Sequence, residues 1–382
     1  MDLQLPDENG RLSPYRLTGT PIQTAEFSRD YNRVVFSAAH VVANPWTAND
    51  PSGPASIDWT ATMAFRRHLH DLGLGIAEAM DTAQRGMGLD WPGALELIRR
   101  TRQEVPDALV FNGAGTDHLS PNDARSLDDV RRAYREQIEA IQKIGGRIIL
   151  MASRALTKLA KGPQDYIDIY RDALSACDEP VALHWLGDMF DPTLAGYWGS
   201  GSFEDAMETA LTVIGENISK VDGIKISLLD KDKEVVMRRR LPEGVKMYTG
   251  DDFNYPELIE GDAQGHSHAL LGIFDPLAPA AAFALSRLKE GDAEGFRAVL
   301  DPTVPLARLI FRAPTQYYKT GVVFLAWLNG FQDHFIMLNG AQAMRPLPYF
   351  TEVFRLADQC GLLRDGDLAI GRMKKMLSMH GV

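Results

Sequence analysis

Lys225 lies in the run Val221–Ser227, where β-branched residues flank a lysine that a buried strand does not ordinarily hold. Because side chains alternate along a strand, Lys225 would share a face with Gly223 and Ser227. A lysine among apolar neighbours loses hydration, so its pKa falls and a neutral amine becomes accessible near pH 7. Such an amine attacks carbonyl groups and forms a Schiff base. The alternative is a lysine at an exposed strand end that reaches water.

The histidines offer a second chemistry. His184 lies in another apolar run, and an imidazole with a pKa near 6.5 can do general acid–base work at neutral pH. Its ordinary alternative is a histidine whose hydrogen bonds are satisfied in the core. His266 and His268 are separated by one residue, which on a strand places both rings on one face, as metal ligands require. With His40 and Asp251 they could converge on a catalytic metal; we keep this as an alternative and expect no metal.

Eight short apolar runs must position these residues, and helical patterns lie between most of them. The alternation predicts a parallel sheet, and eight strands close naturally into a (β/α)8 barrel whose site lies at the carboxyl ends of the strands. A doubly wound sheet is the alternative, but the segment after the first run lacks its glycine-rich phosphate turn. The runs are Arg33–Ala43, Gly75–Met80, Leu109–Gly115, Arg147–Ser153, Pro180–Leu186, Gly223–Ser227, Val245–Gly250 and Gly265–Gly272.

The flanking segments differ from the barrel in pattern. Residues 1–32 are rich in turn formers and are predicted to be an N-terminal extension packed on the main domain. Residues 33–292 form the predicted barrel. Residues 293–382 read as a C-terminal helical region that caps the barrel or builds an oligomer interface, with Val322–Leu328 as an exposed apolar segment.

Composition limits the class of protein. The chain has 382 residues, of which 45% are hydrophobic and 24% charged, as expected for a globular protein. Its 40 basic and 51 acidic residues give a net charge of −11, which disfavours nucleic acid and anionic membranes. The chain contains only two cysteines, Cys177 and Cys360, too few for a disulfide framework or a structural zinc site. We therefore expect a cytoplasmic protein that acts on small molecules.

Three motifs in the second half of the chain occur in order and at matching separations. With them, the chain resembles the dihydrodipicolinate synthase / N-acetylneuraminate lyase family of class I aldolases over about residues 34–360. The resemblance implies a (β/α)8 barrel, a Schiff base at Lys225, no cofactor beyond that covalent bond, and a homodimer or homotetramer. The motifs are Gly223-Ile224-Lys225, Tyr248-Thr249-Gly250-Asp251-Asp252 and Gly261-Asp262-Ala263-Gln264-Gly265-His266-Ser267.

The departures from this family concern substrate recognition and proton transfer. The family's strand-two loop, Gly-Thr-Thr-Gly-Glu, corresponds here to residues 81–85, in which Thr82 is retained and Arg85 could receive an anion by charge-assisted pairing. The family's strand-five tyrosine is replaced by His184, and its strand-four tyrosine pair has no equivalent in Met151–Arg154. These departures argue against the lysine-biosynthesis synthase itself and for a divergent branch.

The resulting hypothesis is a lyase in which Lys225 attacks the carbonyl carbon of a small keto acid or sugar-derived compound, while His184 moves the proton. A metal-dependent isomerase or hydrolase that uses the histidines, and a ligand-binding barrel without catalysis, remain as alternatives. The residues expected to hold the rest of the substrate are Thr82 and Arg85 for an anionic or hydroxyl group, and Asp251, His266 and His268 for the distal part.

Overall fold

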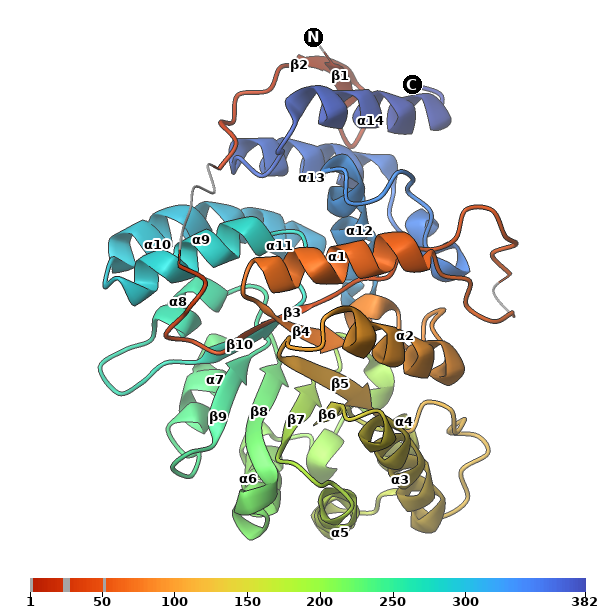
Figure 1. The fold of residues 1–382 in the computed structure, drawn as a ribbon, viewed down its shortest axis with the longest axis vertical. Helices are drawn as coiled ribbons and strands as arrows, with labels where there is room; N and C mark the ends of the chain where they lie inside the picture. Colours follow the sequence, from red (N-terminus) through yellow and green to blue (C-terminus); the bar gives the residue numbers. More distant parts are fainter. Residues whose placement is uncertain (1–2, 23–27, 51–52) are drawn as a thin grey trace.

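The computed structural model describes residues 3–22, 28–50 and 53–382 of the chain (Figure 1). Its centre is a closed barrel of eight parallel strands in the order β10-β3-β4-β5-β6-β7-β8-β9, so the predicted (β/α)8 barrel is confirmed. The barrel strands are β3 (Val35–Ala38), β4 (Gly75–Glu78), β5 (Val110–Ala114), β6 (Arg147–Leu150), β7 (Val181–Leu186), β8 (Val221–Ser227), β9 (Lys246–Thr249) and β10 (His268–Leu271).

Helices follow the strands and cover the outside of the barrel. In α3 a capping box between Ser126 and Asp129 satisfies the first backbone N–H groups, and buried residues recur at helical spacing from Val130 to Ile141. The last connecting helices are short, as the close spacing of the final strands requires. The helices are α1 (Trp59–Asp71), α2 (Trp91–Glu104), α3 (Leu127–Lys143), α4 (Arg154–Leu159), α5 (Pro163–Ser175), α6 (Phe203–Glu216), α7 (Lys231–Arg238), α8 (Tyr255–Glu260) and α9 (Ala278–Lys289).

The barrel interior is divided by a layer of three aromatic rings. The ring centroids of Phe36 and Phe111 lie 4.9 Å apart, and that of Tyr248 lies 5.8 Å from the first and 6.3 Å from the second. Around the barrel, Lys225 is in register with Tyr248, and Tyr248 is in register with His268. Because the strands of a (β/α)8 barrel tilt, each residue in this series lies about one residue closer to the amino-terminal end of the barrel than its partner on the preceding strand. Lys225 therefore lies on the carboxyl-terminal side of the aromatic layer and His268 on the amino-terminal side.

The N-terminal extension contains a two-stranded hairpin, β1 (Leu3–Pro6) and β2 (Leu12–Tyr15). The hairpin lies beside the C-terminal helices in Figure 1, while later in the extension the Tyr31 hydroxyl donates to Leu72 O beside the barrel. The buried Asp358 carboxylate holds the hairpin beside these helices, accepting hydrogen bonds from the Tyr15 hydroxyl at 2.8 Å, Thr18 N at 2.8 Å and Gly19 N at 3.1 Å. Residues 1–2 and 23–27 of the extension lie outside the described residues.

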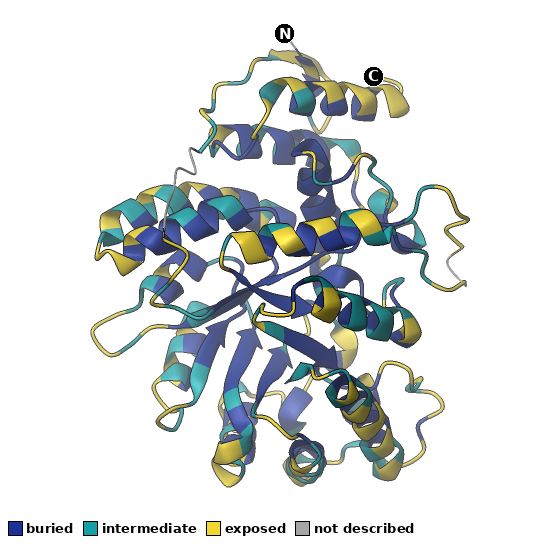
Figure 2. Ribbon diagram, viewed as in Figure 1, coloured by how far each residue is buried: buried dark blue, intermediate teal, exposed yellow. Residues whose placement is uncertain are grey.

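The C-terminal region is helical, as predicted, and consists of α10 (Ala293–Leu300), α11 (Val304–Ile310), α12 (Tyr318–Leu328), α13 (Leu347–Gln359) and α14 (Gly366–Met379). Every residue of α12 is buried, and Figure 2 shows it as a dark core beneath the outer helices. The prediction of an exposed apolar segment at Val322–Leu328 is therefore wrong, because a helix that is apolar on all sides is stable only when it is enclosed. In the described part of the chain, no helix combines the length and apolarity needed to cross a membrane.

Candidate active site

Lys225 lies in the middle of the barrel wall on β8, between His184 of β7 and Tyr248 of β9. It is 7% exposed, and its Nζ makes no hydrogen bond with any residue that the structure describes. The stem of the side chain passes over Gly250, where an added Cβ would lie 2.7 Å from Lys225 Cε. Glycine at position 250 therefore leaves the space that this lysine occupies.

Two acidic side chains act on this amine. Burial lowers the pKa of Lys225 from its usual value of 10.5, and the nearby carboxylates of Asp81 and Asp252 partly oppose that change. Burial also raises the pKa of Asp252 to about 7, although its Oδ1 accepts a hydrogen bond from Ile273 N at 2.8 Å. The site thus pairs an amine that loses its proton easily with a carboxyl group that can hold one at neutral pH.

His184 neighbours Lys225 on the next strand and is 1% exposed. Its Nε2 lies 3.2 Å from the Ser227 hydroxyl. Burial, together with the charge of Lys225, lowers the pKa of His184 well below 6.5, so its imidazole is neutral at pH 7. A neutral ring can accept a proton or a hydrogen bond, and its predicted role in proton transfer stays a prediction.

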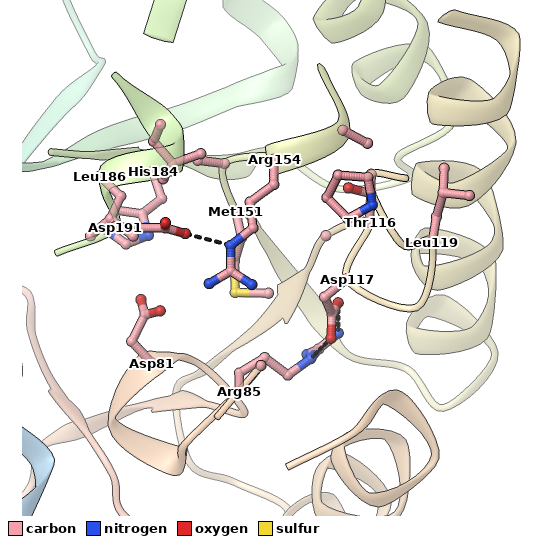
Figure 3. Close-up of a pocket in the computed structure, with 16 residues that line it drawn as sticks. Asp81, Arg85, Thr116, Asp117, Leu119, Met151, Arg154, His184, Leu186 and Asp191 are labelled. Atoms are coloured by element: carbon pink, nitrogen blue, oxygen red, sulfur yellow. Dashed lines mark hydrogen bonds and ion pairs between the residues drawn. The ribbon is translucent and has the colours of Figure 1, made fainter. Parts of the chain in front are cut away.

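A cavity of about 80 Å³ opens at the carboxyl-terminal end of the barrel beside His184 (Figure 3). Lys225 is not one of the residues that line it; its register neighbour His184 is, with Asp81, whose charge reaches the Lys225 amine. The remaining walls are mostly small or apolar residues, such as Gly115, Met151 and Leu186. The charged residues that line the cavity are Asp81, Arg85, Asp117, Arg154 and Asp191.

Arg85 borders the cavity, but its guanidinium is fully used inside the protein. Its Nε and Nη2 donate to the Asp117 carboxylate at 2.7 and 2.8 Å, and Nη2 also donates to Gln137 Oε1 at 2.8 Å. Nη1 donates to the carbonyl oxygens of Ala79 and Gly113, both at 3.1 Å. All five N–H groups thus have partners, so Arg85 holds the loop after β4 in place and has no donor left for the predicted anion.

Thr82 is buried beneath the C-terminal helices. Its hydroxyl lies 2.7 Å from the hydroxyl of Tyr318, the first residue of α12, which is also buried. Burial raises the pKa of Tyr318 well above 10, and the carboxylates of Asp81 and Asp252 act in the same direction. Thr82 is therefore paired with a tyrosine that the sequence reasoning missed, and its predicted role in substrate binding stays a prediction.

Asp251 and Asp252 lie on opposite faces of the chain at the end of β9. Asp251 Oδ1 accepts the backbone N–H groups of Phe253 and Asn254 at 2.8 and 3.1 Å, and its Oδ2 accepts Asn254 Nδ2 at 2.8 Å. Asp251 thus stabilises the turn before α8. Asp252 is the one of the two whose charge acts on Lys225, and the predicted role of Asp251 beside the substrate stays a prediction.

His266 and His268 lie at the opposite end of the barrel from the cavity. His268 is the first residue of β10, and its Nδ1 accepts a hydrogen bond from Val34 N at 3.0 Å. Burial lowers its pKa to about 4. His266 precedes the strand, and its ring centroid lies 5.3 Å from that of His268. Their predicted place beside the distal part of the substrate is therefore wrong.

The same separation affects the metal alternative, which needs those two histidines to meet His184, His40 and Asp251. His40 instead pairs through Nδ1 with Asp275 Oδ2 at 2.8 Å. Across residues 3–22, 28–50 and 53–382, no three His, Cys, Asp or Glu side chains gather closely enough to hold a metal ion. The predicted set of ligands is not assembled.

Several residues of the site escaped the sequence reasoning although some carried a signal. Asp81 opens the loop after β4 and Arg154 directly follows the β6 region, so both occupy strand ends at which barrel sites form. Tyr318 carried no local signal, because it meets Thr82 across 236 positions of sequence. The missed residues are Asp81, Arg154, Asp191, Asp252 and Tyr318.

Solved structures with the same fold are dihydrodipicolinate synthases and their relatives. YagE, a prophage protein of the dihydrodipicolinic acid synthase family from E. coli K12 in complex with pyruvate, matches with a TM-score of 0.66 and 15% identity, covering 87% of this chain and 99% of its own. Dihydrodipicolinate synthase from Aquifex aeolicus gives 0.64 and 12% over the same shares, 87% and 99%. The enzyme from Thermotoga maritima gives 0.64 and 16%, again over 87% and 99%. The TM-scores establish a common fold.

The comparison with curated proteins finds no match to this chain. One family model matches residues 3–382, which is almost the whole chain, and its description is "Protein of unknown function (DUF993)". The match includes the hairpin, the barrel and the C-terminal helices alike. The barrel of this chain has the same fold as the dihydrodipicolinate synthases. The chain itself belongs to the DUF993 family.

Proposed function

We propose that this protein is a lyase of the class I aldolase type, which forms a Schiff base between Lys225 and a small carbonyl compound. One observation carries the proposal: the amine of Lys225 lies inside the barrel without a hydrogen-bonding partner among the described residues. Its pKa is lowered by burial, so the neutral, nucleophilic form is populated more readily than for a lysine in water. The likeness in fold to YagE, which was solved with pyruvate, supports the same reading.

The first half of the reaction needs one proton acceptor and one proton donor. The neutral amine attacks the carbonyl carbon, and a proton passes from nitrogen to oxygen to give a carbinolamine. A second proton then converts the hydroxyl group to water, and its departure leaves a protonated Schiff base. Asp252, with a pKa of about 7, can supply this proton, because it acts electrostatically on Lys225 and is half protonated at neutral pH.

The second half uses the protonated Schiff base to accept electrons. It takes the electron pair of a neighbouring carbon–carbon bond, while a base removes the proton of the hydroxyl group on the departing fragment. The neutral imidazole of His184 is suited to this, since it borders both the amine and the cavity. The cleavage leaves an enamine, whose carbon takes the proton back from the base to restore the protonated Schiff base, and water then hydrolyses this Schiff base and frees Lys225. The same intermediate could instead lose a β-hydroxyl group, which would make the enzyme a dehydratase.

Borohydride trapping tests the proposal directly. The protein is incubated with pyruvate, hydroxyacetone, glyceraldehyde or dihydroxyacetone phosphate, reduced, digested and examined by mass spectrometry. We expect the mass of a reduced adduct on the peptide that contains Lys225, and no adduct in Lys225→Met. Turnover of any of these carbonyl compounds without an adduct on that peptide would contradict the Schiff-base mechanism. An absence of both turnover and adduct across the whole series would contradict the proposed substrate class.

A further inference from the structure

Arg154 is the second arginine at the cavity, and its guanidinium is only partly used. Arg154 begins α4 just beyond β6, and its side chain projects into the cavity between Asp191 and Asp81 (Figure 3). Its Nε donates to the Asp191 carboxylate, which fixes the plane of the guanidinium. Nη1 and Nη2 make no hydrogen bond with any residue in the described part of the chain. The side chain is 44% exposed, so these N–H groups face the open cavity.

Arg85 provides the contrast within the same cavity. Its side chain is 2% exposed and every N–H group has a protein partner. Arg154, in contrast, keeps four N–H groups, which form the planar fork that matches two oxygens of a carboxylate or phosphate. The backbone opposite this fork is Gly86, where an added Cβ would come within 3.5 Å of Nη1 and 3.9 Å of Nη2. A glycine at this position keeps the approach to the fork open.

We propose that Arg154 binds an anionic group, carboxylate or phosphate, of the molecule whose carbonyl carbon reaches Lys225. This inference rests on the proposed function and names the substrate class for the same site. Asp81 connects the two ends of such a molecule, because it lines the cavity with Arg154 and its charge acts on the Lys225 amine. Asp191 orients the guanidinium and also accepts hydrogen bonds from Thr193, so the carboxylate of Asp81 is the one left to accept a hydroxyl group between the two ends.

Matched carbonyl compounds test this assignment through the concentration needed for half-maximal borohydride trapping on Lys225. The neutral and anionic pairs are hydroxyacetone with pyruvate, and dihydroxyacetone with dihydroxyacetone phosphate. In the unaltered protein we expect the anionic member of at least one pair to trap at a concentration roughly tenfold to a hundredfold lower, as for hydrogen bonds to charged groups. Preference within the first pair identifies a carboxylate, and preference within the second a phosphate.

Two arginine substitutions distinguish the loss of the cavity guanidinium from the loss of one positive charge elsewhere on the protein. Arg154→Gln should abolish the preference, because it should raise the half-maximal trapping concentration of the anionic member far more than that of the neutral member. The matched control is Arg135→Gln, which removes another exposed arginine that pairs with an aspartate, Asp172, on the outer helices. This control should keep the preference. A preference that survives Arg154→Gln would overturn the assignment, and so would an unaltered protein that traps both members equally.

Failure of the proposed function leaves a different signature. If no carbonyl compound traps on Lys225, calorimetric titration with pyruvate and with inorganic phosphate still tests the anion site. Binding to the unaltered protein and to Arg135→Gln, but at least roughly tenfold weaker binding to Arg154→Gln, would support an anion site without the lyase chemistry. Absence of binding to the unaltered protein, or equal binding to all three, would overturn it.

Discussion

The two ends of the barrel each hold a lysine on neighbouring strands, and the two lysines differ in their partners. At the amino-terminal end, Lys246 of β9 donates from Nζ to Asp222 Oδ1 at 2.9 Å, and its side chain is 32% exposed. The Tyr248 hydroxyl donates to the other oxygen of the same carboxylate at 2.6 Å. At the carboxyl-terminal end, Lys225 of β8 is 7% exposed and has no hydrogen-bonding partner among the described residues.

The comparison shows that the partners and burial of a lysine, and not the residue type alone, decide how reactive its amine is. The amine of Lys246 has both a carboxylate partner and access to water. Lys225 loses water without gaining a direct partner, so burial moves its pKa downward. The aromatic layer of Phe36, Phe111 and Tyr248 separates these two environments within one barrel.

The largest expected effect comes from removing the two amines. Lys225→Met should abolish the borohydride adduct and lower turnover by several orders of magnitude, because the nucleophile is lost. Lys246→Met should leave the adduct intact and cost only about 0–1 kcal/mol of stability, as expected for a partly exposed ion pair. Trapping, turnover and urea denaturation of both variants provide the measurement. An adduct that persists in Lys225→Met but disappears in Lys246→Met would reverse the assignment of the two ends.

The next effect concerns the glycines beside the two lysines. A Cβ at Gly250 would lie 2.3 Å from Ser227 Oγ and 2.7 Å from Lys225 Cε, while one at Gly223 would lie 2.5 Å from Lys246 O and 2.7 Å from Tyr248 Cε2. Both alanine variants should lose about 1–3 kcal/mol of stability through overpacking. Only Gly250→Ala should also slow trapping, because it displaces the reactive side chain. Equal trapping rates in the two variants, compared under folded conditions, would contradict this distinction.

The eight strands were predictable because each buried strand must be a short apolar run, and the repeated alternation with helices leaves few architectures. For Lys225, alternation along the strand predicted only a face shared with Gly223 and Ser227, and left open whether that face lies inside the barrel. For His268 the sequence contained the information needed to avoid the wrong prediction, namely its position within the strand. A residue at the start of a strand lies at the amino-terminal end of a parallel barrel, whatever its chemistry, and His268 begins β10.

Other parts of the site depend on contacts that no local pattern encodes. Nothing near Arg85 or Arg154 in the sequence tells which guanidinium is satisfied, because the partners of Arg85 come from Asp117 and Gln137, 32 and 52 positions away. For α12 the signal was present, since a helix that is apolar on all sides predicts enclosure. The pattern does not tell whether the chain's own helices or a second subunit enclose α12, and only the fold shows that the chain's own helices do.

A pH titration of stability should give opposite slopes for the two ends. Asp252 has a folded pKa of about 7 against 3.8 as its usual value, so the folded state holds a proton that the unfolded chain loses between these values. Its contribution to stability is present below pH 3.8 and is lost as pH rises through 7. His268 has a folded pKa of about 4 against 6.5, so the unfolded chain binds the extra proton there. Its contribution is present above pH 6.5 and is lost as pH falls through 4.

Asparagine variants measure these slopes. Between pH 4.5 and 6.5, the stability of the unaltered protein minus that of Asp252→Asn should fall, and the corresponding difference for His268→Asn should rise, each by on the order of 2 kcal/mol. Urea denaturation at several pH values gives both differences, and slopes from groups that do not interact with the substituted residue cancel in each subtraction. Slopes of the same sign would show that the acid at the cavity and the histidine at the far end share one electrostatic environment.

The smallest effect is expected from deleting one hydroxyl group at each end. Tyr318→Phe removes the partner of the Thr82 hydroxyl, and Tyr248→Phe removes a donor to Asp222, so each should cost about 1 kcal/mol of stability. Their effects on turnover should differ, because only Tyr318 lies near Asp81 and Asp252, whose charges act on Lys225. Tyr318→Phe should therefore lower turnover several-fold with trapping retained, while Tyr248→Phe leaves both unchanged. If the two variants lose stability but turn over alike, α12 serves only to cover the barrel, and the tyrosine that it contributes plays no part in the chemistry.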